Sequence, residues 1–416
     1  MNAQTRSAGS ALISVVILSA IVYLAIVALL ILAATETQIA YYEQRTMQAF
    51  YGAESALTLG IADLRGYNGE KVSVFNEAVI IGGEPATFSS HLEKPKKKET
   101  GVESLYHHSL VGTATRTGPN GATTRAVQQD IVIKPFALFA SKSLQLRGGC
   151  AIAGHAHGND SVSLDAGALI DGNLTSSAGA PAFSEQVTGK AQGEEEMRLP
   201  IIPLRAYYPK YIYKGEVFEA EPLALPETIP LIAKDDAQPP AAELRLYAQT
   251  PSVKNPAGVF YVSSEINSDA SGALVALAIQ GTLLLEHPVK LRGIVQISAV
   301  DNFPALVNFS ENPLEITLMP IEKIAPFLDA TGSGGRALPN ESLIQGLIYS
   351  LGDVAITADD VGGTALKGSI FAKNITLTGN PTLKMEYNLR VLTNSPPGLQ
   401  LVERSEWREY LTEDGK

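Results

Sequence analysis

Two histidines and a cysteine are the first residues in this sequence whose types suggest a metal site. His155 and His157 are two positions apart, so on a strand both rings point to one face, and Cys150 lies shortly before them. Cys150 is the only cysteine, which excludes an intramolecular disulfide and a thiolate cage for zinc, and the next histidine is His287. We therefore interpret the pair as part of a polar turn and expect no metal or cofactor.

Three acidic residues form the second group with chemical potential. Asp353, Asp359 and Asp360 suggest the paired carboxylates of β-helix lyases and glycosidases. They flank glycine-rich turns, however, where aspartate is common because it hydrogen-bonds the backbone. The sequence also contains no Gly-x-Ser-x-Gly motif for a nucleophilic serine. We expect no enzyme, and a membrane-anchored β-helix enzyme acting on polysaccharide remains the alternative.

Composition and charge restrict the possible partners. The 416 residues include 32 Lys and Arg against 43 Asp and Glu, a net charge of -11, which excludes a nucleic acid as the expected partner. The one basic run, Lys94–Lys98, is interpreted as a solvated loop. With 36 Gly and 24 Pro, the composition is typical of a folded chain with many turns. The length predicts an anchor with one large or two smaller folded units.

A long apolar run near the N-terminus supplies that anchor. No residue from Ser10 to Ala34 is charged, and about 25 apolar residues are enough for a helix to cross a membrane. The run is too long for an ordinary secretory signal, whose apolar core has about 7–15 residues. Arg6 precedes it, which predicts a cytoplasmic N-terminus and a periplasmic or extracellular location for everything after Glu36.

The helix is predicted to continue beyond the membrane, over residues 10–66. Apolar residues recur every three or four positions after the span, and charged residues lie between them. The apolar positions are Met47, Phe50, Ala53, Leu57, Ile61 and Leu64, and the charged ones include Glu43, Arg45, Glu54 and Asp63. The simplest use of such a helix is one half embedded in lipid and one half docked on a folded domain.

These residues resemble the N-terminal region of PilX-type minor pilins and of the K-type minor pseudopilin of type II secretion. The resemblance lies in a short polar leader ending at Gly9, the apolar run from Ser10, and the segment Ala49–Leu57. Within that segment the family-like positions are Phe50, Ala53, Glu54 and Leu57. The resemblance implies that a prepilin peptidase removes residues 1–9 and that the inner-membrane assembly machinery packs the helix against other pilin or pseudopilin subunits.

The fifth residue after the implied cleavage site departs from the main pilins. They carry glutamate there, whereas this chain has Ser14, and PilX-like and K-type subunits often lack the acid as well. The departure implies a minor subunit that starts assembly or lies at the filament tip. A plain signal anchor and an anchored adhesin or scaffold unrelated to pili remain alternatives.

The rest of the chain predicts an α+β protein that is mainly β. Segments rich in Val, Ile, Thr and Tyr indicate a small antiparallel sheet over residues 67–135, packed on the helix. From residue 136, short strands closed by glycine recur, and Lys142–Gly148 is similar to Lys373–Gly379. The rhythm predicts a β-solenoid in two parts, residues 136–193 and 259–390, of the kind found behind such anchors. A β-sandwich is the alternative.

Residues 194–258 interrupt this rhythm. Ten of the 24 prolines fall there, a density that argues against regular sheet, so we interpret the segment as an insertion within one solenoid or as a linker. Residues 391–416 are expected to form a C-terminal tail. The strand-rich residues 67–416 are expected to close their own core without the helix.

Overall fold

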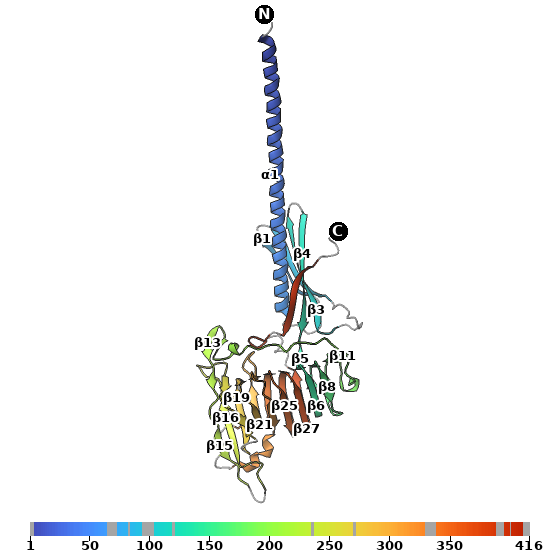
Figure 1. Ribbon diagram of the computed structural model, residues 1–416. Coiled ribbons are helices and arrows are strands. Elements are labelled where there is room, and N and C mark those ends of the chain that lie inside the picture. The colour runs from blue at the N-terminus through green and yellow to red at the C-terminus, as the bar shows by residue number, and fades with distance from the viewer. Residues whose placement is uncertain are drawn as a thin grey trace.

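The computed structural model describes residues 4–64, 73–81, 84–93, 104–118, 121–233, 237–268, 272–328, 338–387, 395–399 and 401–410. One long helix carries a small antiparallel sheet along its second half, and a larger unit of parallel strands lies across its end (Figure 1). The mainly β class, the long apolar helix and the small antiparallel sheet are confirmed. The predicted Lys94–Lys98 loop, the first three leader residues and Gly66 lie outside the described residues.

The helix α1 spans Gln4–Asp63, so it begins before the predicted residue 10. It begins earlier because Gln4–Ala8 contain no proline or glycine, so nothing in that stretch stops the helix from extending through them. The last residues of the predicted leader therefore continue directly into the apolar helix. No charged residue interrupts the helix between Arg6 and Glu36.

The small sheet has the strand order β1-β2-β3-β4-β28, with every neighbouring pair antiparallel. The strands are β1 (Ser73–Ile81), β2 (Glu84–Glu93), β3 (His107–Gly118), β4 (Gly121–Ile133) and β28 (Val402–Tyr410). The C-terminal residues 391–416 are therefore more than the predicted tail, because β28 pairs with β4. An edge strand on β4 satisfies backbone groups that would otherwise be unpaired.

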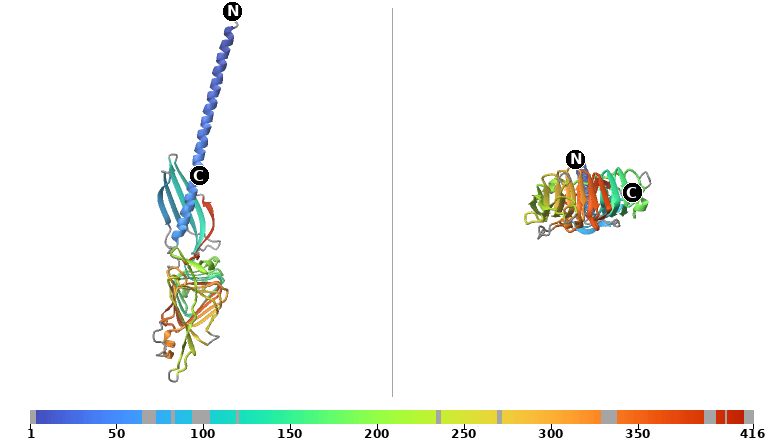
Figure 2. Two further views of the ribbon diagram at one scale, coloured as in Figure 1. Left: turned by 90° about the vertical axis from the view of Figure 1, so that its left-hand side faces the viewer. Right: turned by 90° about the horizontal axis from the view of Figure 1, so that it is seen from below.

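The larger unit stacks its strands in parallel in three rows, because the two halves of its long strands pair in different rows. Figure 2 shows this unit from below. The first row runs β16-β19-β21-β24-β26-β27-β6-β9, the second runs β18-β21-β23-β25-β27-β6-β8, and the third runs β14-β17-β20-β22-β24-β26-β5-β7-β10-β11. The segments compared in the sequence are direct neighbours, with Leu144, Leu146 and Gly148 in register with Ile375, Leu377 and Gly379.

The bounds of the remaining elements follow. The strands up to the proline-rich segment are β5 (Phe136–Ala140), β6 (Ser143–Ala153), β7 (His155–Gly158), β8 (Ser161–Leu164), β9 (Leu169–Asp171), β10 (Leu174–Ser176) and β11 (Ala191–Gly193). Those from the proline-rich segment onward are β12 (Lys210–Tyr213), β13 (Glu216–Glu219), β14 (Glu221–Pro222), β15 (Glu227–Pro230), β16 (Glu243–Gln249), β17 (Val259–Val262), β18 (Ile266–Asn267), β19 (Leu274–Gln280), β20 (Thr282–Leu285), β21 (Val289–Ser298), β22 (Leu306–Asn308), β23 (Leu314–Leu318), β24 (Leu343–Ser350), β25 (Val354–Asp359), β26 (Thr364–Ala372) and β27 (Ile375–Tyr387). The short 3-10 helices are η2 (Ser184–Gln186), η3 (Leu204–Ala206), η4 (Ile321–Lys323) and η5 (Ala325–Phe327).

The chain enters this stack in the middle. From β5 and β6 it runs to the end at β11, crosses within residues 194–258 to the opposite end, and returns through β16–β27 to pair with β5 and β6. The expectation that regular sheet avoids residues 194–258 is wrong, because β12–β16 lie there. Prolines are tolerated since they fall between strands or at strand ends, as Pro222 and Pro230 do.

The stack also differs from a simple solenoid of separate coils. Six strands, β21, β23, β25, β27, β26 and β24, close a ring of parallel pairs, and the other strands extend it. The cause is that long strands bend at glycines, so that each contributes its two halves to two different rows. Gly293 in β21 and Gly368 in β26 have φ of 150° and 154°, and a Cβ on either would overlap the neighbouring backbone.

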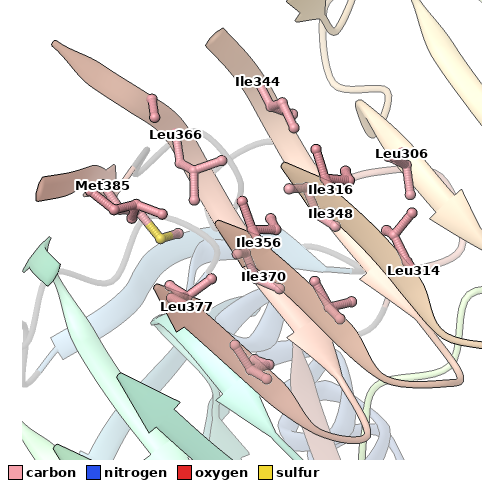
Figure 3. Packing of buried hydrophobic residues seen from close by; sticks show 14 of the residues in the cluster. Leu306, Leu314, Ile316, Ile344, Ile348, Ile356, Leu366, Ile370, Leu377 and Met385 are labelled. Atoms are coloured by element: carbon pink, nitrogen blue, oxygen red, sulfur yellow. The ribbon is translucent and has the colours of Figure 1, made fainter. Parts of the chain in front are cut away.

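The interior of the stack is filled by ladders of aliphatic side chains, shown in Figure 3. Ile316, Ile356 and Leu377 occupy the same register position on successive strands and are fully buried. Burying each such side chain contributes about 1.5–3 kcal/mol. The repeated rungs therefore stabilise the larger unit as one packed body at the end of α1.

Candidate functional site

The exposed first half of α1 is the feature most suggestive of function. Large apolar side chains cover it on all sides, and Leu18, Leu24 and Leu30 are 63–65% exposed. By length and composition the helix is able to cross a membrane. Its hydroxyl groups are partly satisfied internally, since Ser19 Oγ donates to the carbonyl of Val15 at 2.8 Å. That arrangement suits a surface that contacts lipid or other apolar helices.

The second half of α1 packs against one face of the small sheet. Ala53 and Leu57 are buried against β3 and β4, and Phe50 and Glu54 are half-buried beside them. The family-like residues thus lie at or beside the helix–sheet contact. Met47 does not, because 53% of its side chain is exposed, so the predicted apolar stripe is wrong at that position. Ala49 occupies the buried face instead.

Small residues allow the helix to approach the sheet closely. Gly112 of β3 lies against the helix backbone, and a Cβ built on it would stand 2.7 Å from the amide nitrogen of Leu57. Gly52 plays the same role from the helix side, where an added Cβ would stand 2.9 Å from Ala114 Cβ. Neither glycine could be identified from the sequence, because these contacts join residues 55–62 positions apart in the chain.

Replacing Gly112 with valine should separate the helix from the sheet. The added Cβ alone would meet helix backbone, which cannot move aside as a flexible side chain can, and overpacking of this kind costs about 1–3 kcal/mol or more. We expect faster proteolysis between α1 and β3 and a lower unfolding temperature for the detergent-solubilised chain.

Gly363→Ala is the matched control, since a Cβ there meets nothing within 4 Å. If Gly112→Val and Gly363→Ala unfold at the same temperature and resist protease equally, the close helix–sheet packing described above is contradicted.

A buried charge cluster holds the same helix at the end of the sheet nearest its exposed half (Figure 1). Arg45 is only 4% exposed, and its Nη2 donates to the carbonyls of Gly121 at 2.9 Å and Arg116 at 3.2 Å. The carboxylate of Glu84 lies 3.2 Å from Arg116 Nη2 and 3.9 Å from Arg45 Nε, and accepts from the hydroxyl of Tyr41 at 2.6 Å. Arg45, one of the charged residues between the apolar positions of the helix, is therefore part of the helix–sheet contact.

A second polar cluster joins the small sheet to the larger unit. The Glu194 side chain is fully buried and follows β11, yet it accepts from Ser104 Oγ at 2.6 Å and from the backbone N–H of Leu105 at 2.9 Å. His107 Nδ1 lies 3.2 Å from the same carboxylate. Burial raises the pKa of Glu194, but the hydrogen bonds outweigh it and lower that pKa to about 2.

Acid should therefore weaken this joint. Because the folded pKa of Glu194 is depressed, its stabilisation is present above the ordinary value of about 4.5 and disappears as the pH falls toward 2. The difference corresponds to about 3 kcal/mol. We expect the free energy of unfolding to decrease between pH 4.5 and 2 in urea titrations, and Glu194→Gln to remove most of that pH dependence. An unchanged pH profile in the variant would contradict this assignment.

The structure does not bring the histidines and the cysteine together as a metal site. His157 is buried between Thr175 at 2.9 Å and Asn159 at 2.7 Å, and burial lowers its pKa to about 4. Cys150 faces the aliphatic interior, where burial raises the pKa of its thiol to about 11. Within the described residues no group of three His, Cys, Asp or Glu side chains is placed to hold a metal ion.

The three acids also occupy structural positions. Asp353 and Asp359 stand at opposite ends of β25, about 17–20 Å apart along a strand of that length, which is too far for a catalytic pair. Asp353 accepts a hydrogen bond of 2.7 Å from Asn374, which directly precedes the neighbouring strand β27. Asp359 and Asp360 both pair with Lys323, at 3.1 and 3.8 Å, and so hold η4 against the stack.

Comparison with known proteins does not show a family for this chain. A scan against protein-family models and a search of curated proteins give no match. Among solved structures, the crystal structure of the competence-associated pilin ComZ from Thermus thermophilus is similar, with 13% sequence identity and a TM-score of 0.27. The alignment covers 88% of this chain and 98% of that chain. A TM-score of 0.27 is too low to establish a shared fold.

Proposed function

We propose that this chain is a minor pilin-like or pseudopilin-like subunit of a type IV pilus or a type II secretion filament. The observation that carries the proposal is the form of α1: one uninterrupted helix whose first half is apolar and exposed and whose second half is docked on a folded domain. A helix exposed in this way needs lipid or other apolar helices around it, and a filament core supplies the second after the membrane supplies the first.

The sequence resemblance adds the processing steps to this proposal. A prepilin peptidase cuts between Gly9 and Ser10 on the cytoplasmic side, and the inner-membrane machinery then moves the subunit into the filament. The chain is a single-pass membrane protein before that step, with a cytoplasmic N-terminus and a periplasmic or extracellular ectodomain. The solenoid-like stack is the displayed part of the PilX-type or K-type subunit.

Ser14 supports a tip location within the proposed filament. A carboxylate within an apolar helix bundle is costly unless paired, and the acid of main pilins pairs with a neighbouring N-terminal amine as each subunit docks. Ser14 lies on the exposed face of α1 and carries no charge, so it provides no such ion pair. A subunit of this kind is best accommodated where no earlier subunit precedes it. We therefore expect few copies per filament, needed to start assembly.

The mature N-terminus tests the proposal most directly. Purification from native membranes followed by N-terminal sequencing should give a chain that begins at Ser10. A chain that begins at Met1 would favour a plain signal anchor, and one that begins near Thr35 would indicate a removed secretory signal. Either result would contradict the prepilin proposal. Immunogold imaging of the ectodomain should then mark filament ends, whereas uniform labelling along the shaft would rule out a tip subunit.

A further inference from the structure

One end of the larger unit has an interior of different chemistry from the rest. β16 is the last parallel strand of the first row, at the left of Figure 1, and it pairs with β19. The β19 residues that face the aliphatic interior include Val275 and Leu277. The residues in register with them on β16 are Arg245 and Tyr247. The interior ladder therefore changes at its end from aliphatic to cationic and aromatic.

A cavity of about 300 Å³ opens at this place. It lies between β16 and the segment 265–268 that contains β18, and Val275 and Ile266 give it an apolar lining. Arg245, Tyr247, Glu265 and other polar side chains complete it. A polar surface on the last strand protects a stack from association with other proteins. That protection does not require a cavity. The cavity therefore indicates binding in addition to protection.

Its polar side chains are held in place by their neighbours. Arg245 directs Nε and Nη2 at Oε1 of Glu243, at 3.0 and 2.9 Å, so its guanidinium plane is fixed. Asn267 Nδ2 donates to Glu265 Oε1 at 3.1 Å, which orients both side chains. Side chains oriented in advance lose little conformational entropy when a ligand binds.

We propose that this cavity binds a neutral saccharide of one or two sugar rings. A sugar presents vicinal hydroxyl groups that each donate and accept, and the guanidinium, amide and carboxylate groups of Arg245, Asn267 and Glu265 match that mixture. Tyr247 offers an aromatic ring for the apolar C–H face of the sugar. Because Glu243 and Glu265 outnumber Arg245 in charge, an anionic ligand is disfavoured. The volume lies at the lower end of the range for ligand pockets, which limits the size.

Saturation-transfer NMR on the whole chain tests this binding. The protein is kept in a polyoxyethylene detergent, because maltoside and glucoside detergents carry sugar rings that would compete. The probes are glucose, galactose, N-acetylglucosamine, cellobiose, lactose and chitobiose, with glucuronic acid as the anionic comparison. We expect saturation transfer to at least one neutral saccharide. Tyr247→Ala should weaken its binding about tenfold or more, whereas Tyr247→Phe, which keeps the ring, should bind it nearly as well as the unaltered chain.

Controls separate binding from folding. Tyr51→Ala removes an exposed tyrosine on α1, far from the cavity, and should leave saccharide binding unchanged. Asn267→Ala is a second cavity variant, to be used if Tyr247→Ala lowers the unfolding temperature. The proposal is overturned if no neutral saccharide binds at millimolar concentration, if only glucuronic acid binds, or if folded cavity variants bind as tightly as the unaltered chain. None of these results bears on cleavage at Gly9, so this proposal and the pilin-like function fail separately.

Discussion

A fragment of residues 35–416 should be soluble and folded without detergent, whereas a fragment of residues 67–416 should aggregate. The first removes the exposed apolar part of α1 and keeps the docked part. The second also removes Leu57, Ile61 and Leu64, whose burial contributes about 1.5–3 kcal/mol each. Their sum is comparable to the whole stability of a typical domain, about 5–15 kcal/mol. This reverses the sequence-based expectation that residues 67–416 close their own core.

The reason is that, among the residues that the structure describes, the docked part of α1 covers the helix-facing side of the small sheet. Leu110 of β3 and Val127 and Ile131 of β4 share one buried cluster with the docked helix residues. Without the helix, these side chains would face water and offer an apolar surface for association. Size-exclusion chromatography with light scattering distinguishes the fragments. A monodisperse 67–416 fragment that melts at the temperature of the 35–416 fragment would show that the helix adds no stability to the sheet.

Local patterns explain which parts of the fold could be predicted. The apolar run and the three-to-four-residue repeat after it depend on neighbouring residues, so α1 followed from the sequence. The similarity of Lys142–Gly148 to Lys373–Gly379 also reflects the fold, because these segments of β6 and β27 are paired in the register that the similarity suggests. It reveals a repeat, but not that the chain enters the stack in its middle. That order depends on pairing between strands more than 200 residues apart.

Non-local contacts explain what could not be predicted. β28 contains Glu403, Arg404 and Arg408, and these charged residues conceal its strand pattern. Its partner β4 lies some 270 positions earlier in the chain. Arg45 is buried only because Glu84 and Arg116 reach it from the sheet. The candidate saccharide cavity had no sequence signal either, because Arg245 and Tyr247 are distinguished by what occupies the same register positions on β19.

Replacing Gly9 with leucine should abolish leader removal and, with it, entry into the proposed filament. The helix begins at Gln4, so the bond after Gly9 lies in helical backbone, whereas a peptidase needs that backbone to open. Glycine weakens a helix by about 1 kcal/mol relative to alanine, and the first turns lack partners for four N–H groups. Gly9 therefore marks a place where the helix opens easily. Leucine both strengthens the helix and enlarges the residue at the cleavage site.

Mass spectrometry of the membrane-bound protein measures the result, because a retained leader adds the mass of residues 1–9. Ala8→Leu is the matched control, since it places the same side chain one position earlier and leaves Gly9 in place; its product should still begin at Ser10. We expect the Gly9→Leu chain to remain in the membrane and to be missing from sheared filaments, while Ala8→Leu is found in both. Normal processing of Gly9→Leu, or filaments that contain the uncut chain, would show that cleavage at Gly9 does not control assembly.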